Sequence, residues 1–166
     1  MIEPPPCSPQ RAPQQTGLSL DQASTDLAIF KAIAVNADAH RIFRALTLPE
    51  YLEAWICIPG AAPDSLTLAS PEVNGYRLNH FSGHRASLSI SGSFLFCHLR
   101  KIRLFWRKTA NASSAKSVVD FRVRGNFARS VLELRHTEFG TAEELAWYET
   151  LWRRSLENLS SLLRGA

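Results

Sequence analysis

The sequence predicts an α+β fold in which an antiparallel sheet packs against one long C-terminal helix. Residues 26–35 alternate like a strand, and two short helical segments follow them directly. From about residue 141, apolar side chains recur with the 3.6-residue period of a single amphipathic helix. Between these segments, turn signals separate short strand-like runs, as is typical of an antiparallel meander, at 76–81, 86–96, 102–108, 117–124 and 130–136.

Composition and length predict one domain preceded by a tail. The chain has 166 residues, of which 45% are hydrophobic, enough for a buried core. Residues 1–25 are rich in proline and poor in large apolar groups, so we predict a flexible tail there and a domain over residues 26–166. The sequence has no apolar run long enough for a membrane span, no signal peptide and no CxxC pair among its three cysteines. These features favour a cytoplasmic protein.

A strand and two short helices are predicted before residue 60. The stretch "DLAIFKAIAV" alternates apolar side chains between two faces, and Asn36 or Asp38 can cap the helix that follows it. Pro49 opens the second helix at its first position, and Trp55 lies on the apolar face of that helix. A Pro-Gly pair ends this helix, and the stretch after it, rich in Pro, Ala and Ser, is predicted to be irregular up to residue 75.

The strand runs have one apolar face and one charged face. Ile102, Leu104 and Trp106 alternate with basic residues, and the last two runs alternate in the same way. No Asp or Glu occurs between Val73 and Val119, so the charged face is basic. Its simplest role is that of a solvated outer face, although it could attract an anionic ligand, a membrane surface or nucleic acid. Nucleic acid is the least favoured of these partners, because Trp106 lies in phase with the apolar side.

The last predicted helix has a clear capping signal at its N-terminus and a clear stripe of apolar residues along one face. Thr141 and Glu144 have the spacing of a capping box. One helix of about 20 residues, roughly 30 Å long, is therefore predicted. Its apolar stripe consists of Leu145, Tyr148, Trp152, Leu156, Leu159 and Leu163, widened by Trp147 and Leu151.

The stretch "IAVNADAHRIFRALTLPEYLEAWI" (33–56) resembles the opening of the START-like superfamily, also called SRPBCC or polyketide cyclase-like. The most similar branch is the one named after the activator of the ninety-kilodalton heat-shock-protein ATPase. Its members read "V/I-W/F-x-A-L-T" and then "P-E-x-L-x-x-W", which residues 42–47 and 49–55 match. "SGSFLF", "IRLFWRK" and "LELRH" are similar to the later strands of the family. The resemblance covers residues 27–164 and implies a helix-grip fold, with a curved sheet of about six or seven strands wrapped around the C-terminal helix.

The helix-grip resemblance also implies a space between sheet and helix. The sequence leaves open whether this space is a cavity for a small molecule or a filled core. The residues expected to line it, with Trp55 closing one end, are Trp55, Tyr76, Leu78, His80, Phe94, Trp106, Phe121, Leu134, His136, Trp147, Tyr148 and Leu151.

No catalytic constellation is visible in the sequence. His80 and His136 lie in phase with inward apolar residues, and each could anchor a ligand, act as an acid–base group or be purely structural. Because no triad, phosphate-binding loop or metal-ligand spacing accompanies them, we predict no catalytic residue, metal or cofactor. The preferred function is the binding of an apolar or amphipathic small molecule. A chaperone-activator-like protein-interaction module and a cyclase-type enzyme are the alternatives.

Overall fold

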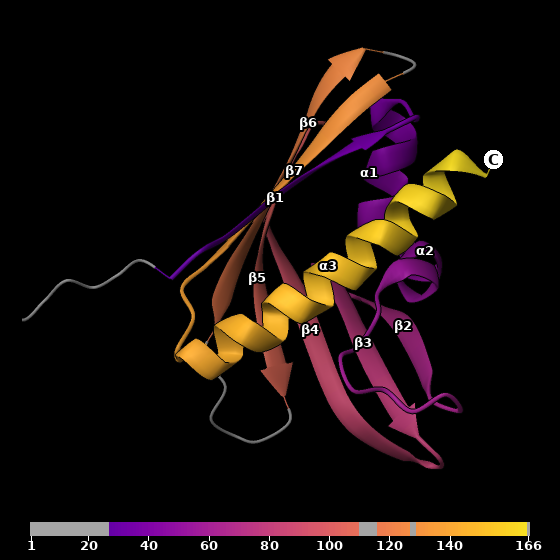
Figure 1. Ribbon diagram of the computed structural model, residues 1–166, viewed down its shortest axis with the longest axis vertical. Helices are drawn as coiled ribbons and strands as arrows, with labels where there is room; N and C mark the ends of the chain where they lie inside the picture. Colours follow the sequence, from indigo (N-terminus) through magenta and orange to yellow (C-terminus); the bar gives the residue numbers. More distant parts are fainter. Residues whose placement is uncertain (1–26, 110–115, 127–128, 166) are drawn as a thin grey trace, which may run out of the picture.

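The computed structural model describes residues 27–109, 116–126 and 129–165. Figure 1 shows a curved sheet with the long C-terminal helix crossing one of its faces, so the predicted α+β helix-grip architecture is confirmed. The tail predicted at residues 1–25 lies outside the described residues. In chain order the elements are β1 (Ile29–Val35), α1 (Ala39–Thr47), α2 (Pro49–Trp55), β2 (Leu66–Glu72), β3 (Gly75–Ser82), β4 (Arg85–His98), β5 (Lys101–Thr109), β6 (Ser117–Asn126), β7 (Arg129–Thr137) and α3 (Ala142–Arg164).

All seven strands belong to one antiparallel sheet in the order β1-β7-β6-β5-β4-β3-β2. Of the strands that the structure describes, the first therefore pairs with the last. The predicted alternation is confirmed on β5, where Ile102, Leu104 and Trp106 are buried and their basic neighbours Arg103 and Arg107 are exposed. The sheet thus has an inner face that packs against α3 and an outer face that carries the charges.

The prediction of irregular chain up to residue 75 is wrong, because residues 66–72 form the edge strand β2. Its pattern is inverted relative to an ordinary half-buried strand. The large residues Leu66 and Leu68 are 55% and 44% exposed, whereas Ala69, opposite the buried Leu78, packs against the core. The alternation of apolar residues in β2 therefore assigns its large side chains to the inner face, although they lie on the outer one. Pro71 further weakens the sequence signal for a strand.

Trp55 joins the two short helices to the rest of the molecule. Its indole Nε1 donates a hydrogen bond of 2.8 Å to the Ala45 carbonyl oxygen, and its ring is 1% exposed. Asn158 Nδ2 of α3 donates to the Trp55 carbonyl oxygen at 3.4 Å, and Cys57 N donates to Ser155 Oγ at 2.9 Å. Trp55 therefore covers the interior where α1, α2 and α3 meet.

The capping predicted for α3 is present. Glu144 N donates to Thr141 Oγ1 at 3.1 Å, and the Glu144 carboxylate accepts from Gly140 N at 2.9 Å. The helix runs for 23 residues and buries most of the predicted stripe, with Leu145 only half-buried at its start. None of the helices in the described part of the chain is long and apolar enough to cross a membrane.

Candidate functional site

A cavity of about 340 Å³ opens at one end of the molecule, where the α2–β2 connection approaches the first turns of α3. We call it the end cavity. Its lining is mixed: seven of the eleven residues are apolar, and four carry polar or charged groups. The residues that line it are Ile58, Pro59, Gly60, Ala61, Ala62, His80, Ser82, Ser87, Leu88, Lys108 and Trp147.

His80 is the buried polar group of the end cavity. Strand β3 places it on the inner face, 6% exposed, and its Nδ1 lies 2.9 Å from Thr67 Oγ1 on β2. Burial lowers the pKa of this imidazole, because desolvation disfavours the charged form. His80 is therefore a neutral hydrogen-bonding group near pH 7, with Thr67 fixing the orientation of its ring.

Trp147 of α3 and Lys108 of β5 form another part of the wall. Trp147 is half-buried at the start of α3, and the Lys108 ammonium nitrogen lies 4.4 Å from the centre of its ring. This contact holds a positive charge over an aromatic face. The end cavity thus combines an apolar wall with a cation on the same side.

Behind the end cavity, aromatic side chains fill the space between sheet and helix. The ring centres of Trp106 and Trp152 are 5.2 Å apart, and Tyr76 lies 6.0 Å from Trp106. Phe94 and Phe121 pack edge-on against this group, at 5.8 Å from Tyr76 and Trp152 respectively. These distances are those of close aromatic packing. The centre of the molecule is therefore occupied by its own side chains.

His136 belongs to a buried polar chain within that aromatic group. Trp152 Nε1 donates to His136 Nδ1 at 2.9 Å, so the proton of the neutral imidazole is assigned to Nε2, 2.7 Å from Ser117 Oγ. The Ser117 hydroxyl in turn donates to the Trp106 carbonyl oxygen at 3.1 Å. Burial lowers the pKa of His136 to about 3. This geometry gives His136 a structural role, because each ring nitrogen already has a partner.

The structure brings two of the predicted lining residues to the end cavity and places the others in the packed interior. His80 and Trp147 line the end cavity. Leu78, Leu134 and Leu151 lie in the buried core. Trp55 closes the helix side, and the other predicted aromatic residues, with His136, form the packed group behind the cavity. Four further lining residues were not predicted: Ser82, Ser87, Leu88 and Lys108. The "IPGAAP" turn does mark the loop that forms the mouth.

Two further observations concern polar groups. Within the described part of the chain, Trp106 Nε1 is the buried side-chain nitrogen or oxygen that lacks a hydrogen-bond partner. No group of His, Cys, Asp or Glu side chains among the described residues is arranged to hold a metal ion.

The curved antiparallel sheet and the long C-terminal helix that it grips define a helix-grip fold, which solved structures share. A Chromobacterium violaceum protein of known structure superimposes with a TM-score of 0.69 at 14% identity, covering 84% of this chain and 99% of that one. The AHSA1 protein from Silicibacter pomeroyi matches with a TM-score of 0.65 at 16% identity, over 82% and 97% of the two chains.

An HSP90 activator from Plasmodium falciparum has the same fold, with a TM-score of 0.58 and 20% identity over 82% of this chain and 95% of that chain. No family model matches the sequence, and no curated protein matches it. At these identities the likeness establishes the fold, which agrees with the resemblance drawn from residues 27–164.

Proposed function

We propose that the domain binds an apolar or amphipathic small molecule in the end cavity, without catalysing a reaction on it. The observation that carries this proposal is the cavity itself. Its volume of about 340 Å³ lies within the range of ligand pockets, roughly 300–1,000 Å³. Ile58, Leu88 and Trp147 supply apolar contact for the body of the ligand.

The polar groups of the end cavity suggest which end of the ligand lies where. His80 can exchange a hydrogen bond with a hydroxyl or carbonyl group, since its Nε2 has no hydrogen-bond partner among the described residues. Lys108, whose ammonium nitrogen lies over the Trp147 ring, adds a cationic group to the lining. The packed aromatic group behind the cavity limits how deep the ligand can go, so we expect a compact ligand rather than a long acyl chain.

Binding can be tested with a compact probe, a fluorescent analogue of a short-chain fatty acid, and with native mass spectrometry of the purified protein for a retained ligand. We expect the Trp147→Ala variant to bind the probe at least fivefold more weakly, because it loses one apolar wall. We also expect it to unfold at nearly the wild-type denaturant concentration, since Trp147 is only half-buried. Phe96→Ala is the matched control, because it removes a 49% exposed aromatic ring from the outer face.

If the wild type binds neither the probe nor any retained molecule, the proposal fails. It also fails if Trp147→Ala and Phe96→Ala bind the probe equally well. A loss of about 3–5 kcal/mol in Trp147→Ala, as for a fully packed core tryptophan, would show that this wall belongs to a solid interior.

A cytoplasmic location is part of the same proposal. Cys57 and Cys97 are free thiols, as expected in a reducing compartment. Fluorescence microscopy of a tagged full-length chain would test this.

A further inference from the structure

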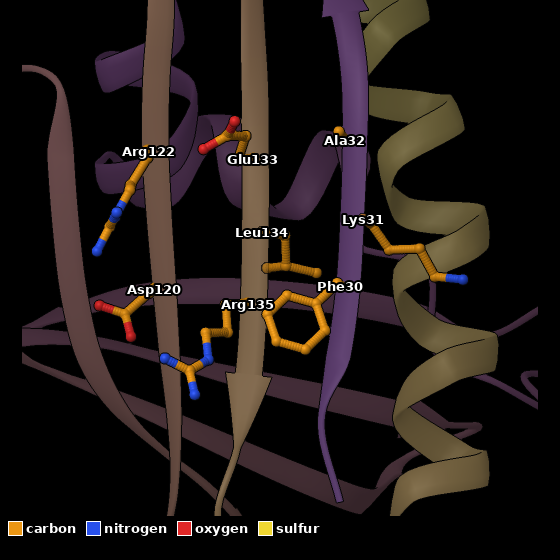
Figure 2. A pocket seen from close by; sticks show the side chains of 8 residues that line it. All are labelled: Phe30, Lys31, Ala32, Asp120, Arg122, Glu133, Leu134 and Arg135. Atoms are coloured by element: carbon orange, nitrogen blue, oxygen red, sulfur yellow. The ribbon is translucent and has the colours of Figure 1, made fainter.

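The outer face of the sheet carries a groove of about 520 Å³ over β1, β7 and β6, separate from the end cavity (Figure 2). Strand register sets its side chains in two rows. Phe30 of β1 lies opposite Arg135 of β7, which lies opposite Asp120 of β6. In the next row, Ala32 lies opposite Glu133, which lies opposite Arg122. We call this hollow, in which Ala32 contributes little bulk, the outer groove.

The two carboxylates of the outer groove are already neutralised. Asp120 is 5% exposed and receives two hydrogen bonds from the Arg103 guanidinium, at 2.7 and 3.0 Å. Glu133 forms an ion pair with Arg124, with 3.1 Å between Glu133 Oε1 and Arg124 Nε. Arg122 and Arg135 are exposed and form no ion pair with any residue that the structure describes. The groove therefore presents two guanidinium groups to a partner.

An exposed aromatic ring lies beside these charges. Phe30 is 65% exposed, and the Arg135 guanidinium carbon lies 5.5 Å from the centre of its ring. Figure 2 shows the ring and the guanidinium side by side on neighbouring strands. Arginine and phenylalanine are both enriched in protein interfaces, where an apolar anchor adjoins a charged contact. The outer groove thus has an apolar side and a cationic side within one hollow.

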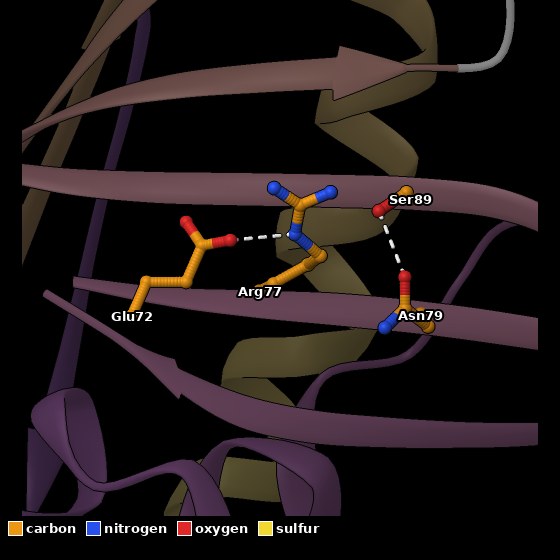
Figure 3. A network of polar contacts seen from close by, with 4 residues as sticks. All are labelled: Glu72, Arg77, Asn79 and Ser89. Carbon is orange, nitrogen blue, oxygen red and sulfur yellow. Dashed lines mark hydrogen bonds and ion pairs between the residues drawn. The ribbon is translucent and has the colours of Figure 1, made fainter.

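The other half of the same face is different. Arg77 is paired with Glu72 at 2.6 Å, and Ser89 donates to Asn79 Oδ1 at 2.9 Å (Figure 3). These contacts satisfy the polar groups of β2, β3 and β4 locally. In the outer groove, by contrast, Arg122 and Arg135 have no ion pair among the described residues and line a hollow.

We propose that the outer groove binds an acidic segment of another protein. Carboxylates of the segment pair with Arg122 and Arg135, and an apolar side chain packs on Phe30. Charge complementarity selects this partner. A nucleic acid fits less well, because a strand of closely spaced phosphates would meet in the groove only two guanidinium groups that lack an ion pair within the described part of the chain, whereas a short peptide can place one carboxylate on each arginine. This surface lies on the opposite side of the sheet from α3, so the inference does not depend on the ligand-binding proposal.

The test is fluorescence anisotropy with the full-length protein and a short labelled peptide of alternating glutamate and leucine. A lysine–leucine peptide and oligothymidylate of the same length are the comparison probes. We expect Arg122→Gln combined with Arg135→Gln to weaken binding of the acidic peptide about tenfold. The control, Arg85→Gln with Arg154→Gln, removes the same charge from exposed positions on β4 and α3 and should change binding less than twofold.

A second measurement keeps the test valid if a variant folds poorly. Amide chemical shifts of the wild type should move on β1, β7 and β6 during titration with the acidic peptide. The proposal is overturned if the wild type binds the lysine peptide or oligothymidylate as tightly as the acidic peptide. Equal weakening by the two double variants, or shifts confined to other strands, overturns it as well. The fatty-acid probe of the end cavity should bind to both double variants with the affinity that it has for the wild type.

Discussion

His136 illustrates how one residue is fixed by its surroundings. Its ring lies against Phe139 and Tyr148, with both ring centres 4.5 Å away, and both ring nitrogens have partners. Protonation would place a second N–H where Trp152 already donates. The folded state therefore requires the neutral form, and this requirement makes stability dependent on pH.

We expect this residue to cause a loss of stability in acid. Because burial lowers the pKa of His136 from 6.5 to about 3, the unfolded chain binds the proton more readily in that interval. The contribution of the neutral His136 to the free energy of unfolding is complete above pH 6.5. It is lost as the pH falls towards 3, by at most about 1.4 kcal/mol per pH unit.

Urea denaturation between pH 7 and pH 4 measures this effect. The His136→Gln variant should be less stable at pH 7 but should lose less stability on acidification than the wild type. His84→Gln, at an exposed histidine, should retain the wild-type slope. Parallel curves for the wild type and His136→Gln would contradict the assignment.

The element scale shows which features the sequence could predict. The predicted end of α2 at the Pro59–Gly60 pair is wrong, because the helix stops at Trp55. The starts of α3 after Thr141 and of α2 at Pro49, which carry capping signals, were predicted correctly. Strand β2 was not, because its large side chains face outwards. The end cavity was predicted only in part, since Lys108 reaches it from the end of a strand that otherwise reads as basic surface. The outer groove depends on register across three strands, which no local pattern specifies.

Strand β4 contains a position where only glycine fits. A Cβ on Gly92 would lie 2.8 Å from Tyr76 Cζ and 3.0 Å from Leu104 Cδ1, both in the packed core. We therefore expect Gly92→Ala to lower the free energy of unfolding by about 1–3 kcal/mol through overpacking. Ser93→Thr, which adds a methyl group on the exposed side of the same strand, should stay within about 0.5 kcal/mol of the wild type in urea denaturation.

At the scale of the whole molecule, contacts between distant parts of the chain dominate. All seven residues of β1 pair with β7, about a hundred residues later, as Ile29 with His136 shows. Asn158 and Trp55 are likewise 103 positions apart. Such long-range pairing slows folding, because the chain must lose much conformational entropy before the contacts form. We expect refolding in milliseconds to seconds by stopped-flow tryptophan fluorescence, and a microsecond relaxation would contradict this.

The pairing of β1 with β7 has a consequence for synthesis on the ribosome. Among the strands that the structure describes, β1 is translated first and pairs only with β7, which is translated last. Until β7 emerges, the apolar side of β1, with Ile29 and Val35, has neither the neighbouring strand nor α3 to cover it. Strands β2 to β6 can form hairpins in order as they leave the tunnel, but β1 must wait for the end of translation. The nascent chain therefore carries an uncovered strand near its N-terminus during most of its synthesis, a segment that chaperones can recognise.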